Sequence, residues 1–362
     1  MRENVMKSFN LKTRYFPISH GVIHGVIDAS TVMVVFSATV LHGLSPSHIA
    51  LMIGGYDLLA FAGQAIFGFG SDTLRLYKST ILLGIALTAL SVVLMPADPF
   101  IAMVAAGLGN ALFHVGAGAV ALNTNPGRAA DPGIFVAPGA LGLALGLWLG
   151  KSGNTVLWPF LLALALSFAV TIKSSLPMLE RYTPSKNSSI KEAMAILFLL
   201  LVSIGIRAFV GFAGTHECPK LPVVSFCLAC AAFGGKALGG IISDRLGWIR
   251  TSVGALLISA PLIALGHASS SIIILGMFFF QMTMPVTLTA VYSIMPRWPA
   301  FSFGLCSTAL VVGSFAAFYQ PLGACYSPYL FFGLITLSAM LIFVALTGLK
   351  ECISMKYAVA TH

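Results

Sequence analysis

Long apolar stretches separated by short polar turns run through almost the whole chain. Twelve such stretches can be marked, at residues 19–42, 48–70, 76–95, 99–122, 132–150, 155–178, 190–213, 221–243, 250–267, 270–294, 300–322 and 326–349. Most reach the roughly 20 residues that a helix needs to cross the hydrocarbon core. They are continuous rather than alternating, and they far exceed a barrel strand of about ten residues. The pattern predicts an all-α polytopic membrane protein with about twelve transmembrane helices.

Basic residues gather on alternate turns. Sixteen of the twenty Lys and Arg residues fall at the chain ends and in the even-to-odd turns, whereas the opposite turns hold only Lys151 and Lys220. Lys and Arg are enriched in cytoplasmic loops of membrane proteins. We therefore expect both termini in the cytoplasm, with the bacterial inner membrane as the location.

Composition agrees with this interpretation. Hydrophobic residues make up 58% of the chain and charged residues 9%, and the mean hydropathy is +0.95. A soluble domain is about a quarter charged. The net charge of +9 indicates topology and contact with the lipid bilayer, not nucleic-acid binding. Loops are too short for a catalytic domain and no phosphate-binding loop is present, so we expect no enzyme activity and no cofactor, and a monomer suffices.

One short segment occurs twice. Residues 63–78 read GQAIFGFGSDTLRLYK and residues 235–250 read GKALGGIISDRLGWIR, each at a charged turn between two apolar runs. Such repeats are typical of transporters built from two related halves. We expect two pseudo-symmetric six-helix bundles at residues 1–178 and 192–362, joined by a polar cytoplasmic linker at 179–191.

Twelve helices, a central linker and the doubled turn resemble the major facilitator superfamily, whose signature after the second helix is roughly G-x-x-x-D-[RK]-x-G-[RK]-[RK]. The resemblance implies gating on the cytoplasmic side by these turns rather than substrate binding. Asp72 and Asp244 would cap the following helix or pair with nearby arginines; simple topology anchoring is the alternative. The gating set is Gly68, Asp72, Arg75, Lys78, Lys236, Gly240, Asp244, Arg245 and Arg250.

Three further segments resemble a narrower group. Residues 56–72, 109–121 and 133–146 look like the second, fourth and fifth helices of fosmidomycin-resistance-type permeases. That resemblance implies proton-driven export of small organic molecules.

Ionisable groups inside a membrane helix are costly and mark functional sites. The first helix carries His20, His24 and Asp28 with helical spacing, so they share one face, and Asp28 lies near mid-depth. A site for a proton, or for sodium instead, is predicted from Asp28, Asp57, His24 and His114, with Tyr56 and Asn110 beside it. Alternatively, Asp28 bonds Ser30 or Thr31, and Asp57 caps a neighbouring helix. His20 is shallow and contributes less.

The second half carries the opposite charge. Arg207 lies deep in the seventh helix, where its guanidinium fork suits a carboxylate or phosphate. The alternatives are an ion pair with an Asp across the interface, or extension of the side chain toward the outer surface. The predicted substrate-binding residues are completed by Tyr56, Asn110, Gln281, Tyr292 and Tyr319.

Cysteines suggest no metal site. Cys227 and Cys230 have C-x-x-C spacing inside an apolar run without further ligands, which favours ordinary packing. Cys218 and Cys325 fall in or near outward-facing turns, and the sequence does not decide whether they form a disulfide.

Three functions fit the sequence. The leading hypothesis is a secondary active transporter that exports a small organic molecule by proton antiport. The second is uptake of an organic anion by proton or sodium symport, anchored by Arg207. The third is a membrane scaffold or sensor without transport, which predicts that Asp28, Asp57 and Arg207 tolerate neutral replacement.

Overall fold

The computed structural model describes residues 15–176, 190–214, 221–266, 269–318 and 327–359. Those residues form helices and connecting turns, with no strand among them. The first half contains α1 (Tyr15–Leu41), α2 (Pro46–Asp57), η1 (Leu58–Ala62), α3 (Gln64–Leu74), α4 (Tyr77–Leu94), α5 (Pro99–Thr124), α6 (Ala130–Lys151) and α7 (Trp158–Lys173). The second contains α8 (Ile190–Gly214), α9 (Pro222–Leu246), α10 (Trp248–Leu265), α11 (Ser270–Gln281), α12 (Met284–Ile294), α13 (Pro299–Phe318) and α14 (Pro328–Val359).

These elements form twelve apolar helical segments, because α2, η1 and α3 make one segment and α11 and α12 make another. Ten of those in the described ranges are long and apolar enough to cross a membrane, and two shorter apolar helices span Trp158–Lys173 and Pro299–Phe315. Two segments are interrupted: α2 passes through the π-helical turn η1 into α3, and α11 meets α12 at a turn at residues 282–283. The predicted all-α membrane protein is confirmed.

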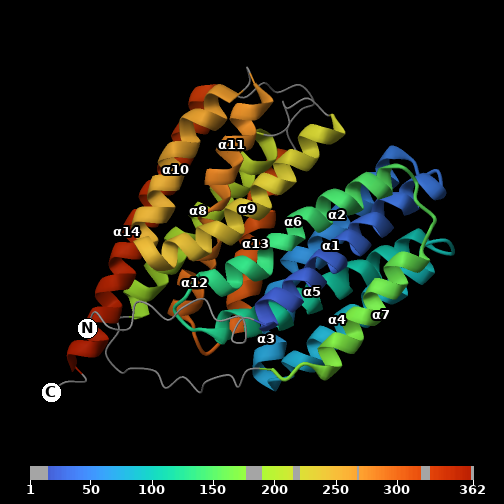
Figure 1. Cartoon of the computed structure of the whole chain (residues 1–362), viewed down its shortest axis with the longest axis horizontal. Coiled ribbons are helices and arrows are strands. Elements are labelled where there is room, and N and C mark those ends of the chain that lie inside the picture. Colours follow the sequence, from blue (N-terminus) through green and yellow to red (C-terminus); the bar gives the residue numbers. More distant parts are fainter. Residues whose placement is uncertain (1–14, 177–189, 215–220, 267–268, 319–326, 360–362) are drawn as a thin grey trace.

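Helices group into two bundles. In the N-terminal half α1 packs on α6 and α4 on α5, whereas in the C-terminal half α14 packs on α8 and α10. The halves meet where α6 contacts α9 and where α13 contacts α3 and α5. Figure 1 shows the blue-to-green half lying beside the yellow-to-red half. The linker expected at 179–191 lies almost wholly outside the described residues, so its boundaries stay a prediction.

Small residues bring α1 and α6 into backbone contact. A Cβ on Gly142 would lie 2.2 Å from the carbonyl oxygen of Gly25, and one on Gly146 would lie 2.5 Å from that of Ala29. Glycine permits this spacing because only a hydrogen separates the two backbones. The close packing matters because both helices contribute to the site described next.

Candidate functional site

A cavity of about 610 Å³ lies between the two bundles. Its lining runs from mid-helix positions toward one end of the molecule: residues 24–36 of α1, 136–147 of α6, 204–212 of α8 and 303–314 of α13 contribute. All four helices begin at the opposite end, where the repeated turns lie; we call that end the motif side. Most lining residues are apolar, and the ionisable lining residues are His24, Asp28, Tyr56, Asp57, His114, Arg207, Lys236 and Cys306.

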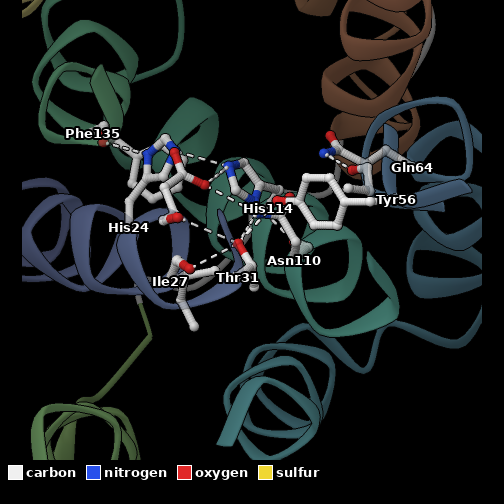
Figure 2. A network of polar contacts seen from close by, with 10 residues as sticks. His24, Ile27, Thr31, Tyr56, Gln64, Asn110, His114 and Phe135 are labelled. Atoms are coloured by element: carbon white, nitrogen blue, oxygen red, sulfur yellow. Dashed lines mark hydrogen bonds and ion pairs between the residues drawn. The ribbon is translucent and has the colours of Figure 1, made fainter. Parts of the chain in front are cut away.

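Two histidines and an aspartate form a tight cluster on the N-terminal wall. The Nε2 atoms of His24 and His114 are 2.8 Å apart. Asp28 Oδ2 lies 3.1 Å from His24 Nε2, and Asp28 Oδ1 lies 3.5 Å from His114 Nε2. Figure 2 shows the two imidazoles side by side. His24 and Asp28 lie one turn apart on α1, and His114 lies on α5.

The outer nitrogens of both imidazoles face backbone acceptors. His24 Nδ1 is 3.0 Å from the carbonyl oxygen of Phe135, and His114 Nδ1 is 2.8 Å from that of Asn110. A carbonyl only accepts, so each Nδ1 carries a hydrogen. Two neutral rings would then turn bare Nε2 lone pairs toward each other at 2.8 Å, which is repulsive. A proton shared among the two Nε2 atoms and the Asp28 carboxylate would remove this repulsion.

A second layer of hydrogen bonds holds the carboxylate. Asn110 Nδ2 donates to Asp28 Oδ1 at 3.0 Å and faces Thr31 Oγ1 at 3.4 Å. Thr31 in turn pairs with the Tyr56 hydroxyl at 2.9 Å. Asp28 is 3% exposed, and a buried charge is tolerated only when it is paired and hydrogen-bonded. The alternative that Asp28 bonds Ser30 or Thr31 through its side chain is not what the structure contains.

The cluster also contains the residue types of a metal site. His24, Asp28 and His114 each offer a ligand atom, and these atoms lie within 4.8 Å of one another. Ligands of one tetrahedral zinc stand roughly 3.3 Å apart, given Zn–N bonds of about 2.0–2.1 Å. The 2.8 Å separation of the two Nε2 atoms is shorter than that and fits a shared proton better.

Asp57 occupies the same cavity but stands outside the cluster. It lies at the junction of α2 and η1, and its side chain forms no hydrogen bond or ion pair among the described residues. A π-helical turn is uncommon and is frequent at functional sites. Here it directs the end of α2 toward the cavity, with Tyr56 and Asp57 both in the lining.

The opposite wall is cationic. Arg207 of α8, 8% exposed, donates from Nη1 to Thr283 Oγ1 at 2.5 Å and from Nη2 to Thr287 Oγ1 at 2.9 Å. Its Nε is buried without a partner. Lys236 of α9 also lines the cavity, and within the described chain its side chain forms neither a hydrogen bond nor an ion pair. Neither the ion pair nor the outward extension considered for Arg207 occurs there.

Both repeated turns tie the halves together at the motif side. Asp72 of α3 accepts hydrogen bonds from the backbone N–H groups of Ala300 (3.1 Å) and Phe301 (2.8 Å), in the first turn of α13. Asp244 of α9 accepts from those of Ala129 (2.8 Å) and Ala130 (3.1 Å), at the start of α6. A carboxylate is favourable there because it satisfies free N–H groups and faces the positive end of the helix dipole.

The glycine of each motif copy allows this contact. A Cβ on Gly68 would lie 2.4 Å from the Ala300 carbonyl oxygen, and one on Gly240 would lie 2.4 Å from that of Ala129. Each aspartate thus caps a helix of the other half, not the following helix as predicted. In the described ranges no ion pair joins Asp72 or Asp244 to an arginine, so Arg75, Arg245 and Arg250 do not play the expected pairing role.

Several predicted residues lie elsewhere than expected. His20 is buried, stacks on Phe16 with ring centroids 3.8 Å apart and faces Thr171, so it does not join the cavity. Tyr292 donates to Asn123 Oδ1 at 2.9 Å, away from the lining. Lys236 lies in the cavity, not at the gate. Lys78 donates to the Ile172 and Ser174 carbonyls at the end of α7.

The remaining predicted positions divide simply. Gln281 lies in the cavity lining, and Asn110 lies behind Asp28. Tyr319, Cys218 and Cys325 fall outside the described residues. Thr283 and Thr287, which accept hydrogen bonds from Arg207, were not among the predicted residues. Their i, i+4 spacing beside a turn was the available signal.

Comparison with known proteins supports the fold. No family model and no curated protein sequence matches the chain. A variant of the E. coli fucose:proton symporter FucP has a TM-score of 0.65 at 12% identity and covers 94% of this chain and 98% of its own. FucP in the outward conformation gives 0.60 at 15% identity, covering 90% and 98%. The human organic anion transporter MFSD10 gives 0.63 at 16% identity, covering 90% and 99%.

At these identities the likeness is one of fold. The chain is an integral membrane protein with the architecture of major facilitator superfamily transporters. The narrower resemblance to fosmidomycin-resistance-type permeases is not shown by these comparisons and stays a prediction.

Proposed function

We propose that this protein is a secondary active transporter that moves a small organic molecule by alternating access and couples its movement to protons. The observation that carries the proposal is the 2.8 Å contact between the Nε2 atoms of His24 and His114. This contact supports a proton-binding site at the wall of a cavity between two half-bundles. We further propose that the protein acts as a monomer, without a cofactor, in the inner membrane.

The proton site works through two charge states. With the shared proton, the pair of imidazoles and the Asp28 carboxylate are neutral together; without it, the cluster carries a net negative charge. The groups that face it are Tyr56 and Asp57 from α2, Lys236 from α9 and Arg207 from α8, all in the same lining. Release of the proton therefore changes the field throughout the cavity, as a coupling site requires.

Alternating access follows from the gate contacts. By the positive-inside rule the motif side faces the cytoplasm, so the described conformation is closed to the cytoplasm and its cavity reaches toward the outside. Opening inward requires that Asp72 leave α13 and that Asp244 leave α6. The equal placement of the two contacts supports a rocking motion of one half against the other.

The proposal is tested with purified protein in liposomes. A thermal-shift panel of drugs, sugars, amino acids, organic acids and phosphates first identifies a ligand. Its uptake is then measured under an imposed pH gradient and, separately, an imposed sodium gradient. Wild type should accumulate the ligand, or expel it, only with the pH gradient. Asp28→Asn, His24→Gln and His114→Gln should each reduce gradient-driven flux at least tenfold and spare gradient-free exchange.

Asp98→Asn is the matched control, because Asp98 caps α5 through the N–H groups of Phe100 and Ile101 and Asn is an equally good cap. Flux driven by the sodium gradient and not by the pH gradient would show that sodium, not the proton, is the coupling ion. Full gradient-driven activity in Asp28→Asn would contradict the proton site. The scaffold hypothesis would be favoured by two results together: no flux by the wild type, and folding of Asp28→Asn, Asp57→Asn and Arg207→Gln like that of the wild type.

A further inference from the structure

The cationic wall of the cavity lacks an anion. Arg207 donates two hydrogen bonds to the neutral hydroxyl oxygens of Thr283 and Thr287, and its buried Nε has no hydrogen-bond partner. The two hydroxyls donate to backbone carbonyls, Thr283 to Phe280 at 3.0 Å and Thr287 to Thr283 at 3.2 Å. Their lone pairs therefore orient the guanidinium without neutralising it. A buried charge left in this condition is costly unless a counter-ion arrives.

The protein's own acids do not supply the missing charge. Asp28 and Asp57 are the acidic residues in the cavity lining, and Asp28 is engaged by His24, His114 and Asn110. Neither carboxylate forms an ion pair with Arg207 or Lys236 in the described structure. With both basic side chains charged, they outnumber the single remaining carboxylate, so the cavity retains uncompensated positive charge.

Lys236 connects this wall to the proton cluster. Lys236, Asp28 and His114 line the same cavity, and charges that share a low-dielectric cavity act on one another. When the cluster has lost its proton, its net negative charge attracts Lys236. When the proton is present, the cluster is neutral and Lys236 is available to another anion. Proton binding and anion binding therefore favour each other, by the same factor in both directions.

The rest of the lining defines the body of the ligand. Phe36, Phe61, Phe212, Phe280 and Phe303 contribute rings, and Met277 and several branched aliphatic residues fill the remainder. Neutral hydrogen-bonding side chains are few, with Tyr56, Gln281, Thr287, Ser307 and Ser314 in the lining. Such a surface suits an apolar or aromatic body, since a sugar would leave many hydroxyls without partners.

We propose that the substrate is an organic monoanion with an apolar body, that its anionic group binds between Arg207 and Lys236, and that it crosses together with a proton. This inference rests on the proposed transport function and names its substrate class and coupling mode. It favours symport of an anion over export by proton antiport, because a proton and an anion bind cooperatively in this cavity and do not compete.

The test uses ligands that differ only in charge. For benzene, naphthalene and biphenyl bodies, the carboxylate, the carboxamide and the aminomethyl cation are compared by thermal shift and by equilibrium binding to purified protein. At least one carboxylate should bind at least tenfold more tightly than its amide and its cation. Arg207→Gln and Lys236→Gln should each weaken that carboxylate about tenfold to a hundredfold, because each removes a charged hydrogen-bond donor.

Two variants and one measurement make the outcome decisive. Lys151→Gln, at the exposed end of α6, should bind normally. Arg207→Lys retains charge without the fork and should fall between wild type and Arg207→Gln. The unliganded melting temperature and gel-filtration profile identify any variant that has not folded, in which case Lys236→Gln alone decides. Preference for amides or cations, or no binding of any carboxylate, would overturn the proposal.

Failure of this inference is distinguishable from failure of the proposed function. Carboxylate binding needs no gradient, so it is measured independently of transport. If carboxylates bind but a pH gradient drives no flux, the anion site stands and proton coupling fails. If an amide or cation is transported and Asp28→Asn loses coupling, the transporter stands and the anion inference fails. Carboxylate flux against an opposing proton flux would overturn symport alone.

Discussion

The two halves of the protein are alike at the motif side and unlike in the cavity. At the motif side each half offers an aspartate, Asp72 or Asp244, to a helix start in the other half, with a glycine one turn earlier in the same position. In the cavity the N-terminal wall carries a hydrogen-bonded network around Asp28. The C-terminal wall carries Arg207 and Lys236, which have no acidic partner.

This difference separates the mechanical part of the protein from the chemical part. The gate must act on both halves in the same manner, so the two copies keep the same Gly and Asp at the same spacing. The cavity must bind one ligand of one polarity, so its walls carry opposite charges. The hydrogen-bonded carboxylate of Asp28 marks a place where the protein supplies the partners itself. Arg207 and Lys236 have no acidic partner, and they mark the place where a ligand contributes.

The largest expected effect comes from crowding the cluster of His24, Asp28 and His114. In Gly139→Ala the new Cβ would lie 2.5 Å from His24 Nε2 and 2.6 Å from Asp28 Oδ2, so the cluster must separate. We expect a loss of about 1–3 kcal/mol in stability and loss of proton-coupled flux. Carboxylate binding at Arg207 should persist but weaken, because proton binding and anion binding favour each other. Gly54→Ala is the control, since a Cβ there meets nothing within 4 Å; equal flux in both variants would mean the cluster is not needed.

A smaller effect is expected at the gate, where the halves are alike. Gly68→Ala or Gly240→Ala should each push α13 or α6 away and favour opening at the motif side. About 1–3 kcal/mol of crowding would shift the two-state ratio roughly 5- to 150-fold. Spin labels are attached at Thr73→Cys and Arg297→Cys in a variant without the six native cysteines. The longer distance between the labels should be populated in a larger fraction of the molecules when the alanine is present.

Each gate variant has a matched control in the same helix or its neighbour. Gly70→Ala and Gly254→Ala add a methyl group where nothing lies within 4 Å, so the distance distribution should not change. Unequal responses of Gly68→Ala and Gly240→Ala would show that the two copies of the motif are not equivalent.

The smallest effect tests how Arg207 is held. Thr287→Val removes the acceptor of the 2.9 Å bond from Arg207 Nη2 with little change in shape. Carboxylate affinity should fall about two- to tenfold, the value of one hydrogen bond. Thr287→Ser retains the hydroxyl and should bind as wild type does. A loss in both variants would point to packing, not to orientation of the guanidinium.

Much of the architecture could be predicted from the chain itself. Continuous apolar runs of membrane length allow only helices, because backbone groups in lipid must be satisfied within the segment. The doubled G-x-x-x-D segment indicated two halves. Asp28 and His24 were singled out because a polar group in such a run is costly, and their spacing of four already put them on one face.

Contacts between distant segments were beyond the sequence. His24 and His114 are 90 positions apart, and a pattern of three or four residues cannot tell which face of α5 meets α1. The partner of Asp72 lies 228 and 229 positions away, so the sequence suggested a local cap instead. His20 shares the spacing of His24, yet packing places it against α7, away from the cavity.

The sequence by itself determined a polytopic helical membrane protein, its two related halves and the few residues whose charge needed a reason. The tertiary structure alone decided which of those charges are paired. Helical periodicity acts over one or two turns, whereas the partners of Asp28, Asp72 and Arg207 come from other helices. Whether a buried charge is neutralised depends on atoms within about 4 Å, and that distance is set by how the two bundles pack.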